Sequence, residues 1–596
     1  MSYHTLAIDS LRECTALAPN HGPALRKLAQ LLHLAGEDAQ ADEAEAAAQR
    51  AAGVEWVNGS DVRASADLEK AERKRIESLK RKPEAEATNT LREHLIAHPL
   101  DAVAIRWLAR LEIRGNDRVT ARTLFERALD LCPGYIGARE DLAQLLIEER
   151  QYAALAETTR LLSEQPGSSR YLLLHAHALI DSGKPAAAID VLVRALREDP
   201  NDARSWRIYA AALLTAGRGE ESVQAYRKCL DLDPAAGEAW WGLSEMKDKV
   251  LTEDDVEEMR AHLDDDTVEP ERRMHMLYAL GQTLERAGEF AKSFEAYEKA
   301  AREFWVGREK KPREEETFDS HDTVQRTKTA FSSNNFATRL VQAPAGNDQD
   351  TPIFVVGMPR AGSTLVEQIL TSHSRIEAIG ERPLVGEIQR ELAFSRLLVE
   401  REAYPDCVLE LTAERFAELG ARVMARSRDY RTTARPYFVD KRPWNWLAVG
   451  LIHLMLPQAK IIDIRREPMA ACFAMYKQLL PRYCTFSYDL KEVGRYYNRY
   501  VKLMEHWETV LPGRVHFIQY ENLVQDTEFE IRRMLAHCGL PFEEGCLRFW
   551  ETERSIVTPS AEQVRRPIYR GALEQWRNFE PWLDPLKEAL GEPVEL

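Results

Sequence analysis

Two glycines bracket a short turn between an apolar run and a helix-forming segment in Ile353–Leu370, which reads IFVVGMPRAGSTLVEQIL. Ile353–Val356 is rich in β-branched residues and predicts a buried strand, and Ser363–Leu370 predicts a helix. Gly357 and Gly362 enclose four residues, so successive backbone N–H groups can point at one place at a helix N-terminus. The sequence therefore predicts a loop that binds phosphate or a similar anion. An ordinary strand–turn–helix corner is the alternative.

The loop differs from that of a nucleoside-triphosphate-binding protein. Its spacing is nearly that of a Walker A loop, but Ser363 stands where that motif has its lysine, and Arg360 lies inside the turn. A P-loop kinase or NTPase would also need an acidic Mg²⁺ ligand at a strand end, for which Asp440 is the nearby candidate. Such an enzyme is an alternative that these residues disfavour.

The strand before this loop is one of several after Thr351. The runs IFVVG, YFVD, KIIDIR and VHFIQY resemble strands and are separated by long helical stretches, which predicts an α/β domain with a central parallel sheet. Lys441 follows the second run and Arg466 follows the third. Because such sheets bind ligands at the carboxyl ends of their strands, we expect Lys441 to lie at a ligand-binding edge.

The first half of the chain is repetitive. Prolines recur every 33 or 34 residues, and a small residue follows each by ten positions, at Pro99, Pro133, Pro166, Pro200 and Pro234 and at Ala109, Ala143, Ala176, Ala210 and Ser244. A proline that ends one helix, with small residues where helices cross closely, predicts stacked helical hairpins. The pattern resembles tetratricopeptide repeats, with one more repeat in Met274–Glu303. The groove of such a solenoid could bind a peptide or protein. A scaffold or dimerisation surface is the alternative, and homodimerisation is left open.

Charge and composition limit the partners. A net charge of -16 over 596 residues argues against general nucleic-acid binding. No apolar run approaches the roughly 20 residues that span a bilayer, and the first residues do not resemble a secretory signal. The eight cysteines are scattered without a C-x-x-C pair, which predicts a reduced, cytoplasmic protein without a structural zinc site.

The segment IFVVGMPRAGSTLVEQILTSHSRIEAIGE resembles the opening of the sulfotransferases that use 3′-phosphoadenosine 5′-phosphosulfate (PAPS). The resemblance covers about residues 351–580. It is nearest to bacterial proteins that join tetratricopeptide repeats to a sulfotransferase domain, and to tyrosylprotein sulfotransferases. It implies that the loop binds the 5′ side of PAPS through Arg360, Ala361, Gly362, Ser363 and Thr364. It also implies that Glu381, 21 residues after Arg360, is the base that takes the proton of an attacking hydroxyl.

The same resemblance implies roles for residues further along. Lys441, in FVDKRPWNW, would assist departure of the bridging oxygen, Arg466 would bind the 3′-phosphate, and Tyr520 would contact the donor. The segment TPSAEQVRRPIYRGALEQW resembles the family's closing loop over the nucleotide. Its implied donor contacts are Ser560, which would lie near the sulfonate, and Arg565, Arg566 and Tyr569.

The chain departs from the family pattern in the 3′-phosphate clamp and near the closing loop. Ala474 replaces a serine, Gln478 replaces an arginine of the tyrosylprotein enzymes, and Gln575 replaces a basic residue. Lys477 or Arg482 could substitute in the clamp, and Arg577 could compensate for Gln575. A non-catalytic repeat scaffold with a decayed nucleotide site is therefore an alternative.

We thus expect a multidomain chain. A tetratricopeptide-repeat α-solenoid would span residues 1–304, a charged and polar linker 305–350, and an α/β P-loop-like sulfotransferase domain with a central parallel sheet 351–596. The expected enzyme transfers a sulfuryl group from PAPS to a hydroxyl with Glu381, Arg360, Lys441 and Ser560 as catalytic residues and no metal. A protein tyrosine is one acceptor; a small alcohol, phenol or saccharide is the alternative.

Overall fold

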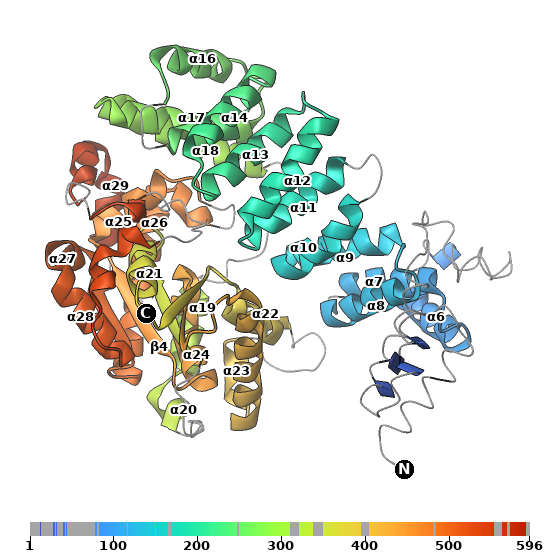
Figure 1. Ribbon diagram of the computed structural model, residues 1–596. Helices are drawn as coiled ribbons and strands as arrows, with labels where there is room; N and C mark the ends of the chain where they lie inside the picture. Colours follow the sequence, from blue (N-terminus) through green and yellow to red (C-terminus); the bar gives the residue numbers. More distant parts are fainter. Residues whose placement is uncertain are drawn as a thin grey trace. The chain divides into compact units, whose positions relative to one another are not determined.

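The computed structural model (Figure 1) describes residues 83–591 except 116, 150, 165–168, 247–249, 310–320, 338–349, 395–403, 481–483, 553–562 and 569–572, with a few single residues before 83. The chain forms two compact units, Met1–Ala178 and Leu179–Leu596. The loop and the strands predicted from the sequence all belong to the second unit.

Antiparallel helical hairpins make up the described part of the first unit. Its helices are α6 (Glu84–Ala97), α7 (Ala102–Arg114), α8 (Arg118–Leu131), α9 (Ile136–Glu148), α10 (Tyr152–Ser163) and the beginning of α11 (Ser169–Asp181). Asp101 caps α7 by accepting from the backbone N–H groups of Val103 and Ala104, which satisfies donors that have no partner inside the helix. Ala109 and Ala143 are buried, as expected for small residues at helix crossings.

The repeats continue in the second unit. Its repeat helices are α12 (Pro185–Glu198), α13 (Ala203–Thr215), α14 (Gly219–Leu232), α15 (Gly237–Ser244), α16 (Glu253–Leu263), α17 (Pro270–Arg286) and α18 (Phe290–Glu309). The hydroxyl of Ser222 on α14 donates to the carbonyl of Ala210 on α13 at 2.8 Å, and that of Ser293 on α18 donates to Gly281 on α17 at 2.7 Å. Because the same contact recurs in two hairpins, the helices cross at equivalent small residues. The predicted repeat fold is confirmed.

A five-stranded parallel sheet forms the centre of the α/β half, as predicted. Its strands are β1 (Thr351–Gly357), β2 (Ile376–Gly380), β3 (Tyr437–Lys441), β4 (Lys460–Arg465) and β5 (Val515–Gln519), in the order β2-β3-β1-β4-β5. All four pairings are parallel. Central β1 is buried on both faces, which explains its unbroken apolar run.

Two apolar cores flank the sheet. Ile353 and Val355 of β1 belong to one core, which α21 (Ser363–Thr371) and α28 (Thr527–Cys538) cover. Phe354 and Val356 point the other way, into a larger core with α24 (Val449–Met455), α25 (Pro468–Tyr476) and α26 (Leu490–Val510). The remaining helices are α22 (Leu384–Phe394), α23 (Ala413–Ser427), α27 (Tyr520–Gln525) and α29 (Asp584–Gly591). Because the strands are parallel, their carboxyl ends lie at one edge of the sheet.

The segment interpreted from sequence as a linker contains helices. α18 runs to Glu309, and α19 (His321–Ala330) and α20 (Ser333–Ala337) follow. Val324 of α19, Phe336 of α20 and Phe331 between the two helices are buried in the larger core. The predicted domain boundaries at 304 and 350 stay a prediction, but the described part of this segment packs as structure.

The last repeat hairpin shares the larger core. Phe304 of α18 stacks on Tyr488 with ring centres 3.8 Å apart, and the hydroxyl of Tyr278 on α17 donates to the carbonyl of Tyr476 at 3.2 Å. Apolar burial of this kind joins α17 and α18 to the α/β half, within the second unit.

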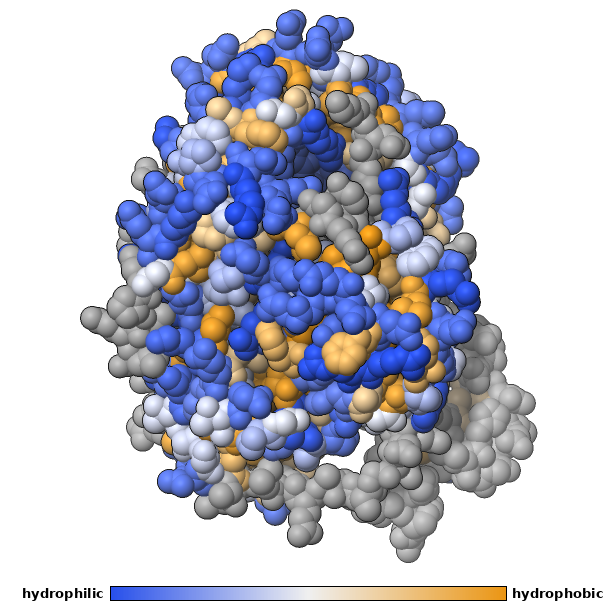
Figure 2. All heavy atoms as spheres, turned by 90° about the vertical axis from the view of Figure 1, so that its left-hand side faces the viewer, coloured by the Kyte–Doolittle hydropathy of each residue, from blue (hydrophilic) through white to orange (hydrophobic). Residues whose placement is uncertain are grey.

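The face drawn in Figure 2 is mostly hydrophilic, with apolar residues scattered between polar ones. Scattered apolar residues are normal on a folded surface. None of the helices in the described ranges has the length and apolar character required to cross a bilayer.

Candidate active site

The predicted anion-binding loop connects β1 to α21. Gly362 has a φ of 105°, and a Cβ there would lie 2.6 Å from the ring of Tyr520. Gly357 has a φ of 142°, and a Cβ there would lie 2.4 Å from the backbone oxygen of Ile464. Only glycine meets both the backbone conformation and the close approach. Ser363 begins α21, so the unpaired N–H groups of its first turn lie at this loop.

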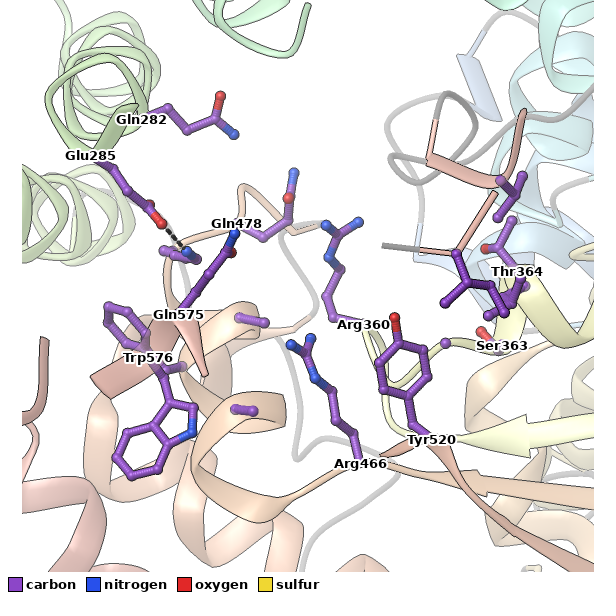
Figure 3. A pocket seen from close by; sticks show the side chains of 18 of the residues that line it. Gln282, Glu285, Arg360, Ser363, Thr364, Arg466, Gln478, Tyr520, Gln575 and Trp576 are labelled. Carbon is purple, nitrogen blue, oxygen red and sulfur yellow. Dashed lines mark hydrogen bonds and ion pairs between the residues drawn. The ribbon is translucent and has the colours of Figure 1, made fainter. Parts of the chain in front are cut away.

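A cavity of about 830 Å³ lies beside the loop (Figure 3). That volume suits a ligand of nucleotide size. The cavity brings together most of the residues predicted to bind the donor: Arg360, Gly362, Ser363, Thr364, Arg466, Tyr520 and Arg566. In Figure 3 the side chains of Arg360 and Arg466 enter the same space, with Tyr520 beside them.

The other predicted donor contacts lie elsewhere or are not described. Ala361 is fully buried and does not line the cavity. Arg565 lies at the turn between α13 and α14, with its Nη1 2.9 Å from where a Cβ on Gly217 would stand, and it also does not line the cavity. Ser560 and Tyr569 lie outside the described residues.

Positive charge gathers in the cavity. Burial lowers the pKa of Arg360; Glu245 opposes this effect and nearby Arg466 adds to it. Burial also lowers the pKa of Lys477, and the charges of Arg360 and Arg466 lower it further. The ion pair with Glu285 acts in the opposite direction and raises this pKa. Because these cations repel one another where little water screens them, an anion bound among them would be stabilised.

Glu381 and Lys441 meet at neighbouring strand ends. Lys441 is the last residue of β3, Glu381 directly follows β2, and the Lys441 ammonium donates to the Glu381 carboxylate. The lysine side chain is 1% exposed and the glutamate side chain 37% exposed. β3 lies between β2 and β1, so this pair stands at the same sheet edge as the loop, although neither residue lines the cavity. A partly exposed carboxylate next to a buried cation can accept a proton while the cation faces developing negative charge.

Asp440, the candidate Mg²⁺ ligand of a P-loop kinase, lies in surroundings that do not suit a metal ligand. It is fully buried, and neither carboxylate oxygen has a hydrogen-bond partner within the described structure. Burial raises the pKa of Asp440 to about 8. It does not line the cavity. Across the described residues, no group of three His, Cys, Asp or Glu side chains is placed to hold a metal ion.

The departures from the family pattern line the same cavity. Ala474, Gln478 and Gln575 are all part of its wall. Lys477, one of the two residues predicted to substitute in the clamp, lines it too, and Arg482 lies outside the described residues. Lys477 and Ala474 thus line the same cavity.

Among the lining residues that sequence reasoning missed are five from the last repeat hairpin: Gln282, Glu285, Arg286, Phe290 and Tyr297. No local pattern marks them, because each is an ordinary residue type for a repeat helix. Their place in the cavity depends on how that hairpin packs against the α/β half.

Two parts of the chain match models of known protein families. Residues 352–544 match the model of the sulfotransferase family. Residues 173–237 match the tetratricopeptide-repeat model. Both resemblances predicted from the sequence are thus confirmed, and the loop, the Glu381–Lys441 pair and Arg466 all fall inside the sulfotransferase match.

Three relatives illustrate the range of similar proteins. An uncharacterized protein of Aquifex aeolicus is 33% identical over 356 residues, which cover 58% of this chain and 45% of that protein. Protein-tyrosine sulfotransferase 1 of Danio rerio is 24% identical over 284 residues, 43% of this chain and 75% of the relative. The omega-hydroxy-beta-dihydromenaquinone-9 sulfotransferase of Mycobacterium bovis is 31% identical over 163 residues, 25% of this chain and 40% of the relative. The chain thus spans less than half the length of the first and third of these relatives.

Proposed function

We propose that this chain is a sulfotransferase that moves a sulfuryl group from PAPS to a hydroxyl acceptor. One arrangement carries the proposal. A cationic cavity beside a glycine loop stands at the sheet edge where Glu381 and Lys441 form their ion pair. The sulfotransferase match over residues 352–544 supports the same chemistry.

Different cavity residues would bind different groups of the donor. The N–H groups at the start of α21, with Ser363 and Thr364, would bind the 5′-phosphosulfate, because a helix N-terminus attracts anions. Arg466 would bind the 3′-phosphate, to which its planar guanidinium is suited. Its Cζ lies 5.3 Å from the ring centre of Tyr520, so the aromatic ring helps to hold the guanidinium in place.

The chemical step needs a base and a cation. Glu381 would take the proton of the acceptor hydroxyl as its oxygen forms a bond to sulfur. The bond between sulfur and the bridging oxygen would break, and its electron pair would stay on the 5′-phosphate of 3′,5′-ADP. Lys441 and Arg360 would stabilise the negative charge that develops on the sulfonate and on the departing oxygen. Ser560, predicted to assist them, lies outside the described residues.

We further propose that the acceptor is a protein or peptide that the repeats help to bind. The repeat match supports this, as does the similarity to the Danio rerio protein-tyrosine sulfotransferase. A small-molecule hydroxyl is the alternative, in line with the name of the mycobacterial relative. Incubation of cell extract with the chain and ³⁵S-labelled PAPS separates the two, because label appears either in protein or in small molecules.

Calorimetric titration with 3′,5′-ADP tests the donor. Binding at micromolar or lower dissociation constant is the expected result. Absence of binding would favour a repeat scaffold with a decayed nucleotide site, the alternative that Ala474 and Gln575 suggest. Mg²⁺-dependent ATP hydrolysis would favour a P-loop kinase or NTPase instead.

A further inference from the structure

One wall of the donor cavity comes from the repeats. α17 contributes three polar residues to the lining, Gln282, Glu285 and Arg286. Aromatic contacts hold this hairpin against the C-terminal segment: the ring centres of Phe290 and Phe579 are 5.3 Å apart, and those of Phe294 and Trp582 are 5.7 Å apart. The repeat hairpin is therefore part of the binding site as well as of the core.

Glu285 reaches from α17 into the cavity and forms an ion pair with Lys477, shown as a dashed line in Figure 3. The Lys477 and Glu285 side chains are 19% and 18% exposed. The ammonium also lies 5.5 Å from the ring centre of Phe473 and 5.7 Å from that of Phe579. Two aromatic rings and a carboxylate thus give this flexible side chain one defined position.

Lys477 directly follows α25 and lines the cavity. Ala474, three residues earlier in the last turn of that helix, lines it too. The methyl group of Ala474 offers an anion no hydrogen bond. The ammonium of Lys477 has three N–H donors, so it can serve Glu285 and an anion at the same time.

The charges of the lining favour an anion with two separate acidic groups. Five basic residues line the cavity (Arg286, Arg360, Arg466, Lys477 and Arg566) against one acidic residue, Glu285, which Lys477 already neutralises. The glycine loop can bind one acidic group. Arg466 and Lys477 line the same cavity but lie outside the glycine loop, so they are left for a second group.

We propose that Lys477, positioned by Glu285 of the repeat helix α17, binds the 3′-phosphate of the donor together with Arg466. The repeats then complete the nucleotide site, and Lys477 replaces the hydroxyl that Ala474 lacks. This assignment rests on the proposed use of PAPS. Lys477 is a specificity-determining residue in this scheme, and Glu285 is a positioning residue that acts through it.

Calorimetry on the full chain tests the proposal with two nucleotides, 3′,5′-ADP and 5′-AMP, which lacks the 3′-phosphate. The wild-type chain should bind 3′,5′-ADP more tightly. Lys477→Met should weaken 3′,5′-ADP binding about 10- to 100-fold, the scale of a hydrogen bond between charged groups, and should change 5′-AMP binding less than about threefold. Glu285→Gln should weaken 3′,5′-ADP binding about 3- to 10-fold, and should have no such effect in a chain that already carries Lys477→Met.

Lys292→Met is the matched control. Lys292 lies on α18 of the same hairpin, is 63% exposed, pairs with Glu289 and does not line the cavity. The control removes the same charge and should leave both affinities unchanged. Thermal melting of each variant checks folding. If Lys477→Met does not fold, Glu285→Gln still tests the assignment, because it leaves the lysine in place.

The outcomes distinguish failure of the 3′-phosphate assignment from failure of the proposed donor. Equal weakening of both nucleotides by Lys477→Met, or no weakening, would overturn the 3′-phosphate assignment. Unchanged 3′,5′-ADP binding by Glu285→Gln would overturn the role of the repeat helix. If the wild-type chain binds neither nucleotide, the proposed donor itself fails, whatever the variants do.

Discussion

The alanine substitution Gly362→Ala tests whether the glycine loop is built for the donor. Gly362 combines a φ of 105° with a Cβ position only 2.6 Å from the Tyr520 ring, and it precedes Ser363 at the start of α21. An alanine there must therefore strain the backbone and also push the loop away from the ring.

The two costs have different sizes and consequences. Left-handed backbone at an L-residue costs about 1–2 kcal/mol of folding free energy. The contact must also lengthen from 2.6 Å to at least 3.4 Å, where ordinary packing begins. Because hydrogen bonds to nitrogen donors occupy a range of only about 0.5 Å, a shift of that size breaks one at the loop. Losing one bond to a charged ligand weakens binding about 10- to 100-fold.

Gly539→Ala provides the matched control. Gly539 has a φ of 74° at the end of α28, and a Cβ there would meet nothing within 4 Å. This variant carries the backbone strain without the contact and lies outside the cavity lining. We expect both variants to lower the melting temperature, and only Gly362→Ala to weaken 3′,5′-ADP binding in calorimetry. If Gly362→Ala binds 3′,5′-ADP as tightly as Gly539→Ala does, the loop is not the donor site and the reasoning is refuted.

Two further substitutions address the strand ends. Glu381→Gln should keep 3′,5′-ADP binding and lower turnover about 10²- to 10⁴-fold, which is the usual contribution of a general base. Initial rates with ³⁵S-labelled PAPS measure this loss, and an unchanged rate would show that Glu381 is not the base. Asp440→Asn should flatten the dependence of stability on pH. Burial raises the pKa of Asp440 from 3.8 to about 8, so the folded chain holds a proton there that the unfolded chain has released, and stability falls as pH rises from about 4 to about 8. The free energy of unfolding of the wild type should therefore fall faster with pH than that of the variant, by up to about 1.4 kcal/mol per pH unit. Equal slopes in denaturant titrations at pH 5.5, 6.5 and 7.5 would show that Asp440 is ionised in the folded chain.

The loop, the strands and the repeats could be predicted because their signals are local. A β-branched run, two glycines and a helix-forming segment already define the β1–α21 corner, since each acts on the backbone within a few residues. The recurring prolines and small residues likewise predict the hairpins, and Ala210 and Ser222 meet as the period implies. The charged composition of the segment after α18 predicts a linker, and its described part contains α19 and α20, because a few apolar residues such as Val324 and Phe336 are enough to anchor mostly polar helices.

By itself, then, the sequence determined the type of each half and the residue types at its strand ends, and the family resemblance marked Ala474 as a departure from the expected serine. Only the tertiary structure decided that Lys477 lines the same cavity as Ala474 and forms an ion pair with Glu285, 192 residues earlier in the chain. The physical reason is that local backbone preferences act only between near neighbours along the chain. The Lys477–Glu285 pair instead forms only after the apolar faces of α17 and α18 have packed against the α/β half. The cavity is therefore lined by residues of both halves.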